Sequence, residues 1–114
     1  MSAPATAQPV QGLETPLPTA SVLMQAAKLA QQQDKPIQLD YYADSCTKRA
    51  FVGEDQDTKD KVLIKNNDEF TSLISKIYRV DNDFLVLTEN SIYIVSGKIE
   101  KRKVQTAALL AKED

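Results

Sequence analysis

The residues that can build a hydrophobic core are unevenly distributed along this chain of 114 residues. Four of the five prolines lie in the first 18 residues, whereas all seven aromatic residues lie between Tyr41 and Tyr93. Proline fixes the backbone φ angle and lacks an amide donor, so residues 1–18 are predicted to form an extended arm. A chain this short has room for one folded unit, and the aromatic residues confine it to the second part of the sequence.

The composition excludes several kinds of chemistry. The chain has no histidine and a single cysteine, so it cannot by itself form a disulfide, a Cys/His zinc site or a His-based catalytic triad. Its formal net charge of -2 gives no general attraction for nucleic acid. We therefore expect a protein that is not an enzyme, with no catalytic residue, no metal ligand and no cofactor.

Two short motifs resemble functional sites only weakly. Ser45 and Lys48 have the spacing of a serine nucleophile and its lysine base, but the companion motifs of such enzymes are missing. The acidic loop that begins at Asp55 resembles a calcium-binding loop, but Lys59 stands at a ligand position and Asp60 replaces the required glycine. A strand and a solvated hairpin loop explain these segments better.

The N-terminal arm is unusual for a tail because the first 35 residues carry only four charged side chains. Two interpretations remain open: a tail without a fixed structure, or an arm whose Val10, Leu13 and Leu17 dock on a partner protein. The arm lacks both the basic start and the continuous apolar stretch of a secretion signal. No segment of the chain is apolar for long enough to predict a membrane-spanning helix.

Residues 19–33 are predicted to form an amphipathic helix, because good helix formers follow Thr19 and Ser21, either of which can act as the N-cap. Its apolar stripe consists of Val22, Leu23, Ala26, Ala27 and Ala30, widened by Met24 and Leu29. The stripe either covers the chain's own sheet or docks in a groove of another protein. In the second case the residues that bind the partner are Val22, Leu23, Met24 and Ala27.

Residues 34–104 are predicted to form a small β-rich domain, because short apolar runs alternate with turn signals. The expected strands are an antiparallel pair over 36–43 and 46–52, then 61–65, then a three-strand meander over 74–80, 84–88 and 92–96, and last 98–104. A helical turn is expected after Asn66 or Asn67. Residues 105–114 are expected to form a short tail or helix.

The predicted fold class is therefore mainly β (α+β). It is a small antiparallel sheet or partial barrel of five to seven strands, with an N-terminal helix and an extended proline-rich arm. So small a unit buries only part of its surface on folding, so assembly with other molecules would stabilise it.

Two charged segments are candidates for contacts between molecules. Lys101, Arg102 and Lys103 form a basic strand, whereas the loop over 54–60 is acidic. Opposite patches of this kind allow molecules to associate head to tail. Solvated strand and loop residues are the simpler interpretation.

The phrases DKPIQLDYYADS (34–45) and FLVLTENSIYIVSGKI (84–99), joined by KVLIKNNDEFTSLISKIYRV, resemble a group of small proteins encoded by nucleocytoplasmic large DNA viruses. The resemblance covers about residues 34–99 and includes no chemically diagnostic residue. Viruses of this kind use small minor capsid proteins to join arrays of major capsid proteins. The resemblance thus implies a location in the virion, assembly in the host cytoplasm, and major and other minor capsid proteins as partners.

The leading hypothesis from the sequence is a non-enzymatic structural protein, a minor capsid component that bridges capsid subunits through residues 1–33. The alternative is a cytoplasmic adaptor with a PH-like or SH3-like β module that binds a peptide or a lipid headgroup.

Overall fold

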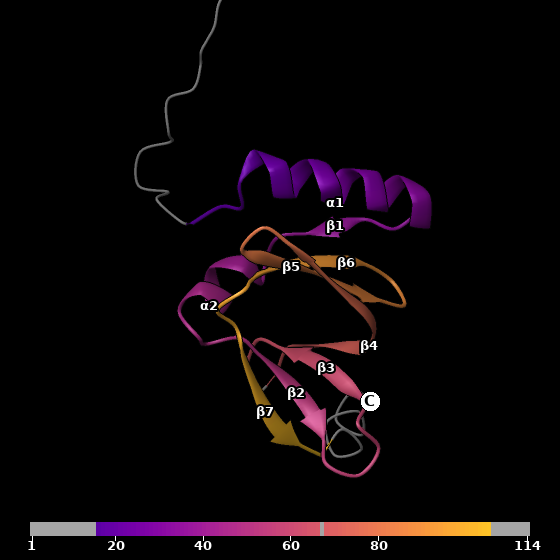
Figure 1. Cartoon of the computed structure of the whole chain (residues 1–114). Coiled ribbons are helices and arrows are strands. Elements are labelled where there is room, and N and C mark those ends of the chain that lie inside the picture. Colours follow the sequence, from indigo (N-terminus) through magenta and orange to yellow (C-terminus); the bar gives the residue numbers. More distant parts are fainter. Residues whose placement is uncertain (1–15, 67, 106–114) are drawn as a thin grey trace, which may run out of the picture.

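The computed structural model describes residues 16–66 and 68–105. Within these residues two helices and seven strands follow one another (Figure 1). They are α1 (Ala20–Gln33), β1 (Ile37–Gln38), α2 (Tyr42–Cys46), β2 (Phe51–Asp55), β3 (Lys61–Ile64), β4 (Phe70–Val80), β5 (Asp83–Thr88), β6 (Ile92–Ser96) and β7 (Glu100–Val104). The predicted mainly β class is confirmed.

The seven strands form one open sheet in the order β1-β6-β5-β4-β3-β2-β7. Within the series β2 to β6, each strand is antiparallel to the next, as expected, and β4, β5 and β6 form the predicted meander. At the two ends of the sheet, however, β1 pairs with β6 and β7 pairs with β2 in parallel. The sheet is therefore mixed, because the segment after β6 carries the chain back to the far side of β2.

The long strand β4 joins two parts of the sheet. Its first residues pair with β3, and its later residues, from Ile74 to Val80, pair with β5. The β4–β5 register shifts between Ile74 and Lys76, which marks a β-bulge, and a bulge bends its strand and increases the local twist. In Figure 1 the group of β1, β5 and β6 consequently lies above the group of β2, β3 and β7.

Helix α1 covers the outer face of β5 and β6, so the first of the two interpretations of its apolar stripe is confirmed (Figure 1). Val22 and Ala26 are completely buried there, in a cluster with Leu85 and Ile94. The helix begins as predicted at Thr19, whose Oγ1 accepts a hydrogen bond from the amide of Val22 at 3.3 Å. Residues 19–33 and 34–104 thus share one core.

A second apolar cluster fills the space between the two parts of the sheet. Its buried members are Tyr41, Ala50, Val52, Leu63, Val86 and Val95. The rings of Tyr41 and Tyr93 meet edge to face with their centres 5.1 Å apart. The two aromatics therefore fill core, as aromatic side chains at strand spacing usually do.

The predicted antiparallel pair over 36–43 and 46–52 is wrong. Only Ile37–Gln38 forms a strand in the first segment, and α2 begins at Tyr42. Tertiary contacts favour this helical turn. The Oγ of Ser45 donates to the carbonyl of Tyr42 and accepts from the amide of Ser96, which ties α2 to the end of β6. Local alternation of apolar residues did not reveal these contacts.

The helical turn expected after Asn66 is also wrong in residues 66 and 68–70. The Asn66 Oδ1 does accept hydrogen bonds from the amides of Asp68 and Glu69, which is the geometry of a cap. The chain nevertheless enters β4 at Phe70. Of the segment 105–114, only Gln105 lies inside the described residues, and it belongs to neither a helix nor a strand.

The turn after β6 lies directly against the turn between β4 and β5. The amide of Gly97 donates to the carbonyl of Asn82 at 2.8 Å. A Cβ atom on Gly97 would lie 2.3 Å from that oxygen, so only glycine allows this approach.

Replacing Val22 with alanine tests the packing of α1. Removal of two buried methyl groups is expected to lower the free energy of unfolding by about 2 kcal/mol, measured by urea denaturation. The matched control is Met24→Ala on the exposed side of the same helix, with an expected change within about 0.5 kcal/mol. Equal losses in the two variants would contradict this packing.

Replacing Tyr42 with phenylalanine tests the link between α2 and β5. The Tyr42 hydroxyl donates to both carboxylate oxygens of buried Asp83 at 3.1 Å, and burial, followed by this hydrogen bond, raises the pKa of Tyr42. Loss of the donor is expected to cost about 1–3 kcal/mol of unfolding free energy. Tyr78→Phe removes an exposed hydroxyl and should leave stability nearly unchanged; a similar loss there would argue against a special role for the Asp83 contact.

Candidate interaction surfaces

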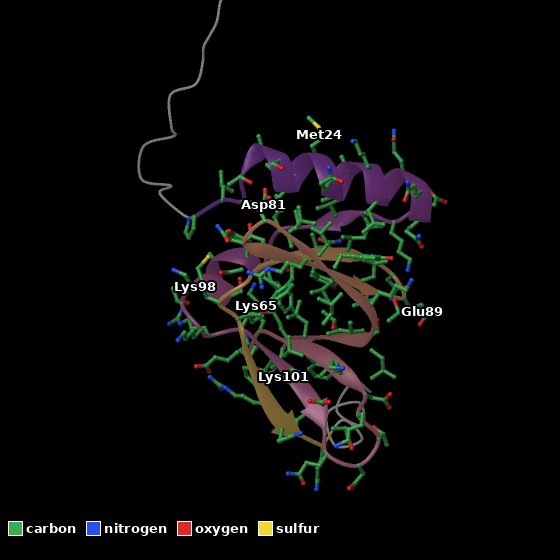
Figure 2. The ribbon with its side chains drawn as sticks, viewed as in Figure 1. Met24, Lys65, Asp81, Glu89, Lys98 and Lys101 are labelled. Carbon is green, nitrogen blue, oxygen red and sulfur yellow. The ribbon has the colours of Figure 1, made fainter. Side chains whose placement is uncertain are left out.

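The residues predicted to bind a partner through the arm and helix divide into two groups. Leu17, Met24 and Ala27 are exposed, with 70% of Leu17 and 60% of Met24 accessible to solvent. Figure 2 shows Met24 on the side of α1 that faces away from the sheet. Val22 is buried and Leu23 packs against the same cluster, so these two do not belong to an outer surface. Val10 and Leu13 lie outside the described residues.

The basic strand is largely neutralised within the molecule. The Nζ atoms of Lys101 and Lys103 each lie 3.8 Å from Glu54 Oε1, and Glu54 is 14% exposed at its side chain. Arg102 pairs with Glu100 at 2.9 Å and stacks over Phe51. Because β2 and β7 are neighbouring strands, the start of the acidic loop lies beside the basic strand. The basic strand and the acidic loop therefore lie side by side and contact each other within one molecule, rather than forming two separate patches.

A cleft of 350 Å³ lies between the two parts of the sheet. Its apolar lining consists of Val52, Ile77, Phe84, Val86, Val95 and Ile99. Lys61, Glu100 and Lys101 also line it. The second apolar cluster therefore opens to solvent on this side, and the sheet does not close into a barrel.

A second hollow of the same volume, 350 Å³, lies on the other face of β4 and β5, beside α1. Leu29 of α1 and Tyr78, Val80 and Leu85 of the sheet form its apolar part. Lys28 adds positive charge, and Arg79 also lines the hollow, with its guanidinium carbon 5.4 Å from the centre of the Phe84 ring. We call this hollow the α1 groove.

The strand segment between the cleft and the α1 groove has one open edge. From Ser75 to Val80, β4 extends beyond the start of β3 and pairs only with β5 among the strands of the described residues. Ile77 is 40% exposed and Tyr78 is 37% exposed, although β4 is the middle strand of the sheet. We call Ser75–Val80 the β4 edge.

Sequence reasoning missed the cleft and the β4 edge. Adjacent large side chains at Ile77 and Tyr78, one for each face of the strand, were the available signal. That signal did not show that β3 begins too late along the chain to cover Ser75–Val80.

The described residues contain no group of three or more His, Cys, Asp or Glu side chains that could hold a metal ion. The Oγ of Ser45 is occupied by backbone hydrogen bonds, and Lys48 is exposed on the following turn. Asp55 Oδ1 accepts from the amides of Asp57 and Thr58, which closes the acidic loop on itself. Within these residues no helix is long and apolar enough to span a membrane.

Comparison with known proteins found no matching family model, no matching curated protein and no matching solved structure.

Replacing Glu54 with glutamine tests the neutralisation of the basic strand. Lys101 and Lys103 would lose their shared partner, so stronger retention on a heparin column is expected, with a stability change below about 1 kcal/mol. Glu89→Gln makes the same change of net charge at an exposed turn and is the matched control. Equal retention of the two variants would show that Glu54 does not shield these lysines.

Proposed function

We propose that this protein is a non-enzymatic structural protein that joins other proteins. The observation that carries the proposal is the division of α1. Its inner side is used by the chain's own core, whereas Leu17, Met24 and Ala27 remain outside where the arm meets the helix. Exposed apolar side chains that continue into a segment with little charge are suited to contact with another protein.

The setting we propose is the capsid of a large icosahedral DNA virus. The resemblance of residues 34–45 and 84–99 to small proteins of such viruses supports this setting. In it the β-rich domain is a minor capsid component of the virion, assembled in the host cytoplasm, and the arm and helix, residues 1–33, bridge neighbouring capsid subunits. The major capsid protein and other minor capsid proteins are then the partners.

A second candidate function is that of an adaptor that binds a peptide. The open apolar cleft favours it, because most of its lining side chains are available for hydrophobic contact with a peptide.

The experiment for the structural role is deletion of residues 1–15, which keeps buried Pro18 and the cap Thr19 in place. The shortened chain is expected to fold, as judged by circular dichroism, and to fall about tenfold in the amount that co-sediments with purified particles, a loss typical of removing one binding hot spot.

A second variant with Leu17→Ser and Met24→Ser should show the same defect, whereas Gln31→Ser on an exposed part of α1 should not. Normal incorporation of both the shortened chain and the double variant would refute the bridging role.

A further inference from the structure

The β4 edge is an unfilled position in the sheet. Alternate residues of a strand direct their N–H and C=O groups to the same edge, so about three residues of Ser75–Val80 offer both groups to the open side. Within the described residues no strand uses them. Open edges of this kind pair with extended chains, and the added strand gains main-chain hydrogen bonds.

The two hollows beside the edge would receive the side chains of an added strand. Successive side chains of a strand point to opposite faces of the sheet. The cleft lies on one face with Ile77, and the α1 groove lies on the other face with Tyr78. Each has a volume of 350 Å³, at the lower end of the range for ligand pockets, which suits individual apolar side chains.

Positive charge surrounds the β4 edge, although the whole chain carries a net charge of -2. The cleft, the α1 groove and a shallow hollow at the bulge are lined by six cationic side chains and two carboxylates. The cations are Lys28, Lys59, Lys61, Lys76, Arg79 and Lys101. Glu100 is paired with Arg102 and Lys101 with Glu54, so five cations and one carboxylate, Asp60, remain. This distribution favours an acidic occupant.

The same charges disfavour two other occupants. A second copy paired through its own β4 edge would bring Lys76 and Arg79 against like charges. The N-terminal arm has one carboxylate, Glu14, within residues 1–15, and its prolines remove amide donors that an added strand needs.

We propose that the β4 edge binds an acidic, extended segment of a partner protein as an eighth strand of the sheet. Apolar side chains of that segment alternate between the cleft and the α1 groove, and its carboxylates face the surrounding lysines and arginines. The inference rests on the proposed function only in taking the partner to be a protein, and it uses a different surface from the arm.

The test uses the full chain and a short fluorescent peptide in which valine, leucine and valine stand between Asp-Glu and Glu-Asp pairs. Fluorescence anisotropy is expected to show saturable binding that weakens with added salt. A peptide with lysines in place of the acidic residues should not bind. Alternate amides of an added strand face the β4 edge, so N-methylation of either the central leucine or the valine that follows it, made in two separate peptides, should abolish binding in one of them. Docking through side chains alone would tolerate both.

The site is tested by reversing charges with Lys76→Glu and Arg79→Glu, both at exposed positions of the β4 edge. This double variant is expected to bind the acidic peptide at least about tenfold more weakly. Lys48→Glu with Arg49→Glu makes the same charge change beside a hollow that shares no residue with the cleft or the α1 groove, and should bind normally.

Amide hydrogen exchange locates the bound peptide. New protection at residues 75–80 supports the proposal. Protection confined to other residues, equal weakening by the two double variants, binding that survives both N-methylations, or no binding at millimolar peptide would each overturn it. Dimerisation of the chain through 75–80, seen by ultracentrifugation and competing with the peptide, would overturn it in favour of a second copy. Each of these results leaves the arm-deletion experiment unaffected, so the two proposals fail separately.

Discussion

Strand β4 pairs with β3 through its first residues and with β5 through its later ones, and most features of this protein follow from that division. The β4–β5 register shifts between Ile74 and Lys76. Strand β3 has four residues and β4 has eleven, so β3 covers only part of the edge of β4. The bend separates the sheet into two parts and leaves an apolar cleft between them, and the short β3 leaves one backbone edge exposed from Ser75 to Val80.

Helix α1 covers only part of the apolar face of the sheet. Helix α1 lies over β5 and β6, where Val22 and Ala26 reach the cluster that contains Leu85 and Ile94. It leaves uncovered the part of β4 that carries Tyr78, and the α1 groove forms there. The cleft therefore follows from the bend in β4, and the α1 groove follows from the limited part of the sheet that α1 covers.

The side chains of the described residues that resemble catalytic or metal-binding groups already have partners within the fold. Ser45 and Asp55 are engaged by backbone hydrogen bonds, to Tyr42 and Ser96 in the first case and to Asp57 and Thr58 in the second. The basic strand β7 is paired with Glu54 and Glu100. Positive charge also lies around the β4 edge, next to exposed apolar side chains, and this combination underlies the proposal of an acidic peptide ligand.

The amino-acid sequence by itself determined the elements whose stability is local. Helix α1 follows from its helix-forming residues and the Thr19 cap, and the meander of β4, β5 and β6 follows from apolar runs separated by polar turns. Only the tertiary structure decided that Tyr42 and Ser45 lie in a helical turn, because Asp83 and Ser96, both distant in sequence, supply the hydrogen bonds that hold it. The cleft and the β4 edge were likewise decided in three dimensions. Register between strands and the late start of β3 depend on contacts between distant residues, and no local pattern of residues encodes them.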